Sequence, residues 1–593
     1  MPETFSAESA LGVILDDSEG AAIFRRYLPH LPAQPYVLPL RHMPVGELVS
    51  VFGGSLLDAD ASEQLWADLA ALGPKTHGPV SEYVESRITP RTDYEPESVE
   101  RGSAEVSHPA VVERWDAFEL ELRGPRHANP FVDVDVAARF TPAGAGAGAD
   151  VRVGGFYDGD GRYVVRFMPP SEGEWSFITE STARSLDGIA GGFTVQRPGV
   201  GNRGQVRVDG QFHFVHANGE PFVPLGTTAY AWTHQSAALQ ERTIETLSGA
   251  GFTKLRMCLF PKSYDFNLKE PDCFPFERTE DGTFDFARFD LSYFRNLEHR
   301  IHQLQKLGVE ADLILFHPYD RWGFSDLGKV VDDRFVSYVV RRLAAFRNVW
   351  WSMANEYDLL RSKSLEDWER LAGIVTHEDH VGHLTSIHNW ITMYDHSRPW
   401  ITHSSIQSNA VERISEWRFT WGKPVVLDEC GYEGDVPHGW GNLTGEDLTR
   451  MHWEAAVRGA YAGHGETFLN PAEELWWAKG GELVGHSPER IAFLRSVIEA
   501  SPTGRLEPLP SDFDLPWGGV AERYAVGYFG AHQPRYRDVQ RRPGTRYHVD
   551  VIDTWSMTIE RLPGVLDGSM RVELPARPYM ALRLIAVDQA SPA

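Results

Sequence analysis

Cysteine is scarce in this sequence, which has three cysteines among 593 residues. A small, odd number of cysteines provides no disulfide framework. Long apolar runs are also missing, because no stretch approaches the roughly 20 apolar residues of a membrane-spanning helix. The first residues, MPETFSAESALGVILDDSEG, lack the cationic region and the apolar run of a secretory signal. Together these absences predict a cytoplasmic protein with no membrane partner.

Positive charge is in short supply as well. The sequence has 57 Lys and Arg against 83 Asp and Glu, which gives a formal net charge of −26. Nucleic acids and anionic membranes attract proteins through a positive field, so this balance argues against both as partners. A Gly-rich phosphate loop and a dinucleotide fingerprint are absent, and we expect no cofactor. The charge balance fits an enzyme that acts on a neutral substrate.

Aromatic residues, in contrast, are plentiful and make up 12% of the chain, with 18 Trp. Most Trp side chains are expected in the protein core. Indole rings also line sugar-binding clefts, because their faces stack on the C–H faces of sugar rings.

Length and patterning divide the chain into several parts. At roughly 100–200 residues per domain, this length predicts three or four domains. Capped amphipathic segments in residues 1–95 predict a small helical domain. Alternating apolar and polar residues with Asp-Gly turns predict an N-terminal β-sandwich over 105–200 and a C-terminal one over 505–593.

Residues 204–500 alternate strand-like apolar runs with helical segments. Such alternation over about 300 residues predicts a (β/α)8 TIM barrel around a parallel sheet. The runs FVPLGTTAY, TKLRMCLF, VEADLILF and NVWWSMA are the expected strands one to four, and PVVL and GHGETFL the expected strands seven and eight. Strands five and six are expected between Pro399 and Trp421. The predicted fold class is therefore multidomain α/β.

Two carboxylates end apolar strands of this barrel. Asn355-Glu356 follows the fourth apolar run, and Asp428-Glu429 follows the seventh. Active sites of (β/α)8 enzymes lie at the C-terminal ends of the strands. Partial burial there raises the pKa of a glutamic acid, as a general acid needs. Two carboxyl groups roughly 5–5.5 Å apart are the requirement of a retaining glycoside hydrolase.

This pattern resembles the clan-A retaining glycoside hydrolases. The resemblance implies that Glu356 is the acid/base and Glu429 the nucleophile, while Asn355 hydrogen-bonds the sugar 2-hydroxyl. It also implies that an Arg at the end of strand two holds the nucleophile, so Arg256 is expected to pair with Glu429. Six further residues, which stand near strand ends, are expected to contact or support the substrate: His317, Asp320, His403, Tyr432, Trp476 and Trp477.

Longer segments are similar to the apiosidase-like glycoside hydrolases. HPYDRWGF, DECGYEG and AGHGET, which stands ahead of a Trp pair, carry the likeness in the barrel. NPFVDVDV, GFYDGDGRYVVRFMP and GEWSF resemble the β-sandwich that precedes such barrels, and the C-terminal sandwich resembles the domain that follows them. The resemblance covers residues 105–593 and leaves residues 1–90 unexplained.

Other interpretations of these residues remain open. Glu433 rivals Glu429 as nucleophile, and Cys430 invites a thiol mechanism, although a thiol nucleophile needs a His base poised on it. A buried, inert thiol is the preferred interpretation of Cys430. A cluster with no His-Glu-x-x-His spacing is interpreted as a solvated, irregular segment and not as a metal site: His377, Glu378, His380 and His383.

The resemblance implies double displacement, and a cytoplasmic location implies exo action on small oligosaccharides or glycosides. One alternative is an endo-acting polysaccharide hydrolase or a transglycosylase on the same scaffold. Another is a carbohydrate-binding protein with a degenerate barrel. A homo-oligomer also stays open, and the helical first 90 residues are expected either to form a subunit contact or to brace the barrel.

Overall fold

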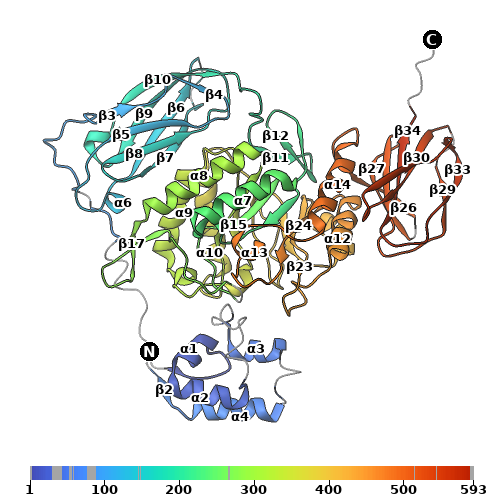
Figure 1. The fold of residues 1–593 in the computed structure, drawn as a ribbon. Coiled ribbons are helices and arrows are strands. Elements are labelled where there is room, and N and C mark those ends of the chain that lie inside the picture. The colour runs from blue at the N-terminus through green and yellow to red at the C-terminus, as the bar shows by residue number, and fades with distance from the viewer. Residues whose placement is uncertain are drawn as a thin grey trace.

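The computed structural model describes residues 3–29, 43–52, 59–75, 88–91, 93–144, 148–264, 267–512, 514–541 and 544–587, with single residues 40, 57 and 146. A parallel barrel lies at the centre, between an N-terminal and a C-terminal β-sandwich, and a small helical domain lies at one end of the barrel (Figure 1). Among the described residues, no helix has both the length and the apolar character required to cross a membrane.

Eight parallel strands form the nearly closed barrel. Their spatial order is β20-β19-β18-β15-β14-β24-β22-β21. Neighbouring barrel strands therefore follow one another in the sequence, as in a (β/α)8 barrel. Most positions of the longer strands are buried, as expected for a sheet covered by helices. The strands are β14 (Gly226–Thr228), β15 (Lys254–Cys258), β18 (Glu310–Phe316), β19 (Val349–Ala354), β20 (Thr385–Ser386), β21 (Ser404–Gln407), β22 (Val425–Glu429) and β24 (Tyr461–His464).

Amphipathic helices cover the outside of the barrel. Asp290 caps the start of α8 by accepting from the backbone N–H groups of Ser292 and Tyr293, and Gly308 ends it with φ of 72°. The helices are α7 (Ala237–Ala250), α8 (Leu291–Leu307), α9 (Lys329–Leu343), α10 (Leu365–Glu378), α11 (Ile414–Trp421), α12 (Gly445–Val457), α13 (Trp476–Lys479) and α14 (Ser487–Glu499). Short pairs β16 (Phe276–Arg278) with β17 (Phe284–Phe289), and β23 (Glu433–Gly434) with β25 (Glu466–Thr467), lie in the loops.

The fifth strand does not lie where the sequence predicted it. It is β20, only two residues long, and it precedes Pro399 instead of following it. The helix before it, α10, ends at Glu378. The barrel closes between strands five and six through Thr385 and Thr402, because the Thr402 N–H donates to the Thr385 carbonyl at 2.8 Å.

The N-terminal sandwich packs directly on the barrel helices. Its sheet runs β3-β5-β8-β7-β6-β9-β10-β4, and aromatic side chains such as Phe118, Phe140 and Phe193 fill its interior. Phe156 and Val164 belong to the same apolar cluster as the barrel. The elements are β3 (Glu105–Ser107), β4 (Val111–Glu113), β5 (Phe118–Arg123), α6 (Pro130–Asp133), β6 (Val136–Pro142), β7 (Val151–Tyr157), β8 (Arg162–Phe167), β9 (Gly173–Ser181) and β10 (Ala190–Gln196).

A three-stranded sheet leads from this sandwich into the barrel, formed by β11 (Val206–Asp209), β12 (His213–His216) and β13 (Pro221–Phe222). Phe214 and Phe222 place their rings beside Trp350, near the start of β19. This sheet therefore packs beneath the barrel, at the end opposite the carboxyl ends of the strands.

The C-terminal sandwich follows α14. Six strands run β26-β27-β28-β34-β30-β31, β32 pairs with β30, and β29 pairs with β33. The strands are β26 (Glu507–Asp512), β27 (Leu515–Val520), β28 (Tyr524–Tyr528), β29 (Tyr536–Gln540), β30 (Arg546–Asp553), β31 (Thr558–Arg561), β32 (Leu566–Asp567), β33 (Ser569–Glu573) and β34 (Met580–Ala586).

The N-terminal helices contact the barrel beside its C-terminal face. Their apolar cluster includes Leu359, which follows β19, and Trp390 packs against it. Arg361 also pairs with Glu47 of α3. The described part of this unit contains β1 (Glu3–Thr4), α1 (Leu11–Asp16), α2 (Ser18–Tyr27), α3 (Val45–Phe52), α4 (Ala59–Ala70) and β2 (Pro74–Lys75). Other parts of the predicted 1–95 domain lie outside the described residues. The bounds of the four predicted domains stay predictions.

Candidate active site

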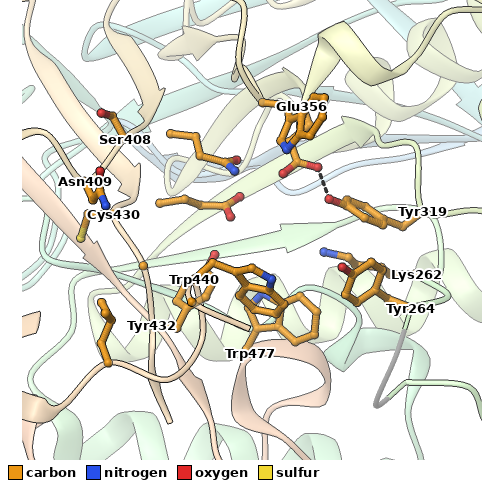
Figure 2. Close-up of a pocket in the computed structure, with 16 residues that line it drawn as sticks. Lys262, Tyr264, Tyr319, Glu356, Ser408, Asn409, Cys430, Tyr432, Trp440 and Trp477 are labelled. Atoms are coloured by element: carbon orange, nitrogen blue, oxygen red, sulfur yellow. Dashed lines mark hydrogen bonds between the residues drawn. The ribbon is translucent and has the colours of Figure 1, made fainter. Parts of the chain in front are cut away.

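Glu356 and Glu429 face one pocket at the carboxyl ends of the barrel strands. Glu356 follows β19 directly, and Glu429 is the last residue of β22. The pocket has a volume of about 370 Å³, and Figure 2 shows the side chains around it. Its lining is Lys262, Tyr264, Tyr319, Glu356, Trp390, Gln407, Ser408, Asn409, Glu429, Cys430, Gly431, Tyr432, Gly439, Trp440, Leu443 and Trp477.

Glu356 lies in an apolar environment with one hydrogen-bond donor. The residue is 3% exposed, and the Tyr319 hydroxyl donates to its Oε2 (Figure 2). Its backbone is left-handed, with φ of 50°, which is uncommon for a residue other than glycine and turns the chain sharply after the strand. Burial, and next the negative charge of Glu429, raise the pKa of Glu356 to about 8. The carboxyl group therefore holds its proton at neutral pH.

Glu429 lies in a polar environment instead. Arg256 Nη1 lies 3.0 Å from Glu429 Oε1, so the predicted pairing of these two residues is present. The Tyr230 hydroxyl donates to the same oxygen, and His388 Nε2 lies 3.8 Å from it. Asn355 Oδ1 accepts from Arg256 Nη1 at 2.8 Å. One guanidinium therefore positions the carboxylate and the neighbouring amide together.

A buried ion cluster supports the pocket from below. Lys254 Nζ lies 2.6 Å from Asp312 Oδ2 and 2.6 Å from Asp428 Oδ1, and all three side chains are at most 2% exposed. Ser405 Oγ donates to the other oxygen of Asp428 at 2.5 Å. Asp428 is therefore a hydrogen-bond acceptor within the barrel, and its neighbour Glu429 faces the pocket.

Comparison with known proteins places the chain in a family. The family described as "Apiosidase-like, catalytic domain" matches residues 209–468, and two domains of unknown function, DUF5060 and DUF5605, match 111–182 and 513–585. A protein from Bacteroides vulgatus, described as a candidate glycoside hydrolase, has 38% sequence identity and a TM-score of 0.76. The match covers 81% of this chain and all of that one. The chain belongs to the apiosidase-like glycoside hydrolases.

More distant structures share the fold of the enzyme. A family 5 glycoside hydrolase from Bacteroides vulgatus is 15% identical, with a TM-score of 0.51 over 65% of this chain and 93% of its own. Another glycoside hydrolase is 14% identical, with a TM-score of 0.50 over 66% of this chain and 98% of its own. These two structures share the fold of this chain. No curated protein matches the chain.

Six predicted site residues lie outside the lining of the pocket. Two of them, Arg256 and Asn355, still belong to the hydrogen-bond network of Glu429. His317 and Asp320 shape the loop after β18: Nδ1 of His317 accepts from the Tyr319 N–H at 3.2 Å, and Asp320 accepts from Trp322 and Ser325. The other two lie deeper in the barrel, where His403 packs edge-on against Trp350 and Trp476 donates to Thr227 at 2.8 Å. Tyr432 and Trp477 do line the pocket.

The rival residues have other partners. Glu433 accepts from the His486 and Ser487 N–H groups at 2.8 and 2.9 Å, and so binds the start of α14. Burial raises the pKa of the Cys430 thiol to about 12, which keeps it neutral. Glu433, His464 and Glu466 have metal-ligand spacing, but both carboxylates already accept backbone hydrogen bonds from residues 484–487.

The segment around His383 differs from the prediction of a solvated, irregular stretch. His377 and Glu378 belong to α10, and Glu378 pairs with Arg341. His383 Nδ1 lies 3.0 Å from Asp379 Oδ1, and both side chains are buried. His380 Nε2 accepts from the Met168 N–H of the N-terminal sandwich at 3.0 Å. Glu378 and His383 are therefore buried with partners, whereas His377 is exposed and His380 is half-buried.

Sequence reasoning missed most of the pocket lining, and four residues of the pocket and its support show why. Tyr230 stands two residues after β14, near a strand end, which is a signal of the same kind as the one that identified Glu356. Tyr319 lies between two residues that were singled out, in HPYD. Lys262 and Trp440 stand in long loops after β15 and β22, where the sequence gives no spacing rule to predict which side chains point inward.

Proposed function

We propose that the enzyme hydrolyses its glycoside by double displacement with retention of configuration. Glu429 attacks the anomeric carbon while Glu356 gives its proton to the glycosidic oxygen, which leaves with the aglycone. Glu356 then takes a proton from water, and the hydroxide oxygen displaces Glu429 from the glycosyl-enzyme. The opposed environments of the two carboxyl groups support this assignment most directly, because one is buried and protonated and the other is ion-paired.

Supporting roles follow from the contacts around the pair. Arg256 and Tyr230 hold the Glu429 carboxyl group in place for attack on the anomeric carbon. Asn355 uses Oδ1 to accept from Arg256 and Tyr230, and we assign its Nδ2 to the sugar 2-hydroxyl. Tyr432 and Trp477 provide aromatic faces for the glycone. His317, Asp320, His403 and Trp476 act indirectly, through the loop and the barrel core.

Exo action fits the size of the pocket. Small-molecule sites commonly measure roughly 300–1,000 Å³, and a volume of about 370 Å³ lies at the small end of that range. Trp390 and Trp440 belong to its wall, and the N-terminal helices pack behind Trp390. A terminal sugar fits such a pocket better than the interior of a long chain.

The test is hydrolysis of a panel of 4-nitrophenyl glycosides by wild type, Glu356→Ala and Glu429→Ala, each with and without sodium azide. We expect loss of activity in both variants, on the order of 10²- to 10⁴-fold for the acid/base. Azide should restore turnover in both, with a glycosyl azide of inverted configuration from Glu429→Ala and of retained configuration from Glu356→Ala.

Glu433→Gln is the matched control, because Glu433 lies four residues from Glu429 and binds α14. It should lower the melting temperature and leave kcat/KM near the wild-type value. Full activity of Glu429→Ala, or loss of activity in folded Glu433→Gln, would contradict the assignment.

A further inference from the structure

Lys262 is a buried cation within the pocket. The residue is 4% exposed and follows β15. Its Nζ lies 3.7 Å from the ring centroid of Tyr230, 4.1 Å from that of Tyr319 and 4.5 Å from that of Trp477. Figure 2 shows the amino group turned toward the space in front of Glu356 and Tyr319. The ammonium therefore lies among aromatic rings, at the surface that a bound sugar would touch.

The buried lysines of the described residues differ in their partners. Lys254 lies 2.6 Å from two aspartates, Lys363 Nζ lies 2.7 Å from Asp332, and Lys479 Nζ lies 3.9 Å from Glu473. Lys262 is the fourth buried lysine, and within the described ranges no carboxylate approaches its Nζ within 4 Å. Cation–π contacts offset part of the cost of burying an ammonium, but they do not satisfy its three N–H donors.

Among the described residues, no carboxylate forms an ion pair with Lys262, although Glu429 and Glu356 lie close enough to act on its charge. Glu429 is paired with Arg256, and Glu356 holds a proton at neutral pH. The Cys258 thiol beside Lys262 is neutral, because burial raises its pKa to about 12. Burial lowers the pKa of Lys262 to about 8, so its amino group is still protonated at neutral pH. Lys262 therefore places an ammonium in the pocket that has no ion-pair partner among the described residues.

We propose that Lys262 binds a carboxylate of the glycone, so that the enzyme acts on glycosides of a uronic acid. A single ammonium is a point charge that suits one carboxylate, whereas sulfate and phosphate sites commonly add an Arg fork or a cluster of backbone N–H groups. The net charge of −26 favours a neutral substrate for the molecule as a whole, but Lys262 places a cation at the surface of the pocket. This inference rests on the proposed glycosidase reaction.

The test compares wild type with Lys262→Met on two matched pairs of 4-nitrophenyl substrates: β-D-glucuronide with β-D-glucoside, and β-D-galacturonide with β-D-galactoside. We expect wild type to have the higher kcat/KM on the acid member of at least one pair. Lys262→Met should lose on the order of 10- to 100-fold on that member and much less on its neutral partner. A wild-type preference for the neutral member in both pairs, or an equal loss on both members, overturns the inference.

Two variants serve as controls for charge. Lys262→Arg keeps the positive charge and should retain part of the preference for the acid member. Lys306→Met, on the exposed side of α8, makes the same change in net charge far from the pocket and should leave the preference unchanged. If Lys306→Met reduces the preference as much as Lys262→Met does, the effect is one of overall charge and the subsite is wrong.

Binding separates this inference from the catalytic proposal. The melting temperatures of wild type and Lys262→Met are measured with sodium D-glucuronate, sodium D-galacturonate, D-glucose and D-galactose. If a uronate stabilises only wild type while no glycoside is cleaved, the subsite stands and the proposed reaction fails. If no uronate is cleaved and none stabilises wild type, the inference is wrong, whatever the activity on neutral glycosides.

Discussion

At the scale of residues, the site places two glutamates in different environments. Glu356 is buried beside the Tyr319 hydroxyl, and burial stabilises its proton. Glu429 contacts a guanidinium and a second tyrosine, which stabilise its negative charge. Environment, and not residue type, therefore assigns the acid and the nucleophile.

Tyr230→Phe tests the contacts of Glu429. The variant removes a hydroxyl that donates to the carboxylate, and hydrogen bonds to charged groups contribute roughly 1.5–3 kcal/mol. We expect kcat/KM to fall on the order of 10- to 100-fold with the fold intact. Tyr394→Phe is the control, because Tyr394 also donates to a carboxylate, Glu369, at 2.9 Å, outside the pocket. Equal activity of the two variants would show that the Tyr230 hydroxyl has no catalytic role.

The pH dependence tests the protonation of Glu356. A general acid works only while protonated, so kcat/KM should fall as the pH rises through about 8, the raised pKa of Glu356. The Tyr319 hydroxyl lowers this pKa by donating to the carboxylate. Tyr319→Phe should therefore move the alkaline limb to higher pH, by on the order of one unit. A shift to lower pH in the kcat/KM profile would contradict the assignment.

These residues differ in how far the sequence alone predicts them. Glu356, Glu429 and Arg256 end apolar runs, and the barrel brings all strand ends to one face, so a linear pattern locates them. Lys262 and Tyr319 lie in loops, where the side chain that points into the pocket depends on backbone turns formed only in the folded chain. The sequence shows these residues without showing that they belong to the site.

At the scale of elements, strand length decides what patterning can predict. β18 and β19 have seven and six residues, all buried, and their apolar runs stand out in the sequence. β20 has two residues and is flanked by buried histidines, so it lacks an apolar run. Its place is fixed by contacts with β19 and with Thr402, which no local pattern records.

Glu310 provides a test of stability at the start of β18. Burial raises its pKa to about 8, and Trp350 Nε1 donates to its carboxyl group at 3.0 Å. Between the unfolded pKa near 4.3 and the folded value, the native state holds the extra proton, so stability falls as the pH rises through this window.

Glu310→Gln removes that titration and keeps an acceptor for Trp350. Its melting temperature relative to wild type should rise between pH 5 and pH 9, by roughly 2–4 °C for each kcal/mol recovered. Glu245→Gln, on the exposed face of α7, should track wild type at every pH. A difference between Glu310→Gln and wild type that does not grow with pH would contradict the raised pKa of Glu310.

At the scale of the whole molecule, the N-terminal sandwich and the barrel share a buried seam. Arg342 of α9 lies 2.8 Å from Asp158 of the sandwich and 2.5 Å from Glu298 of α8. Arg166 of β8 lies 2.5 Å from the same glutamate. The apolar cluster that crosses the seam makes the sandwich a structural part of the barrel.

Arg342→Met tests the seam. The variant leaves two buried carboxylates with fewer partners, which costs about 3–5 kcal/mol. We expect a melting temperature lower by roughly 2–4 °C per kcal/mol, with kcat of the folded enzyme unchanged. Arg139→Met, which breaks ion pairs on the exposed surface of the sandwich, should cost about 1 kcal/mol or less. If the two variants lower the melting temperature equally, the buried ion pairs of the seam contribute no more to stability than the exposed ones.

The helical unit at the N-terminus contacts the barrel beside the active site, and no sequence motif predicts this contact. Leu359 follows the turn that bears Glu356, and it is buried in the cluster of the N-terminal helices. Trp390 packs on the same cluster and also lines the pocket. Residues that the sequence leaves without a role thus lie next to the wall of the site.

Covalent labelling of the enzyme is the most direct test that Glu429 is the nucleophile. The enzyme is incubated with a 2-deoxy-2-fluoro glycoside of the sugar that the panel identifies, and the modified peptide is located by mass spectrometry. If Glu429 is the nucleophile, wild type should carry one added glycosyl group, attached to Glu429, and Glu429→Ala should carry none. A label on Glu356 or Glu433, or an inverted product with no labelled enzyme, would contradict the proposed mechanism.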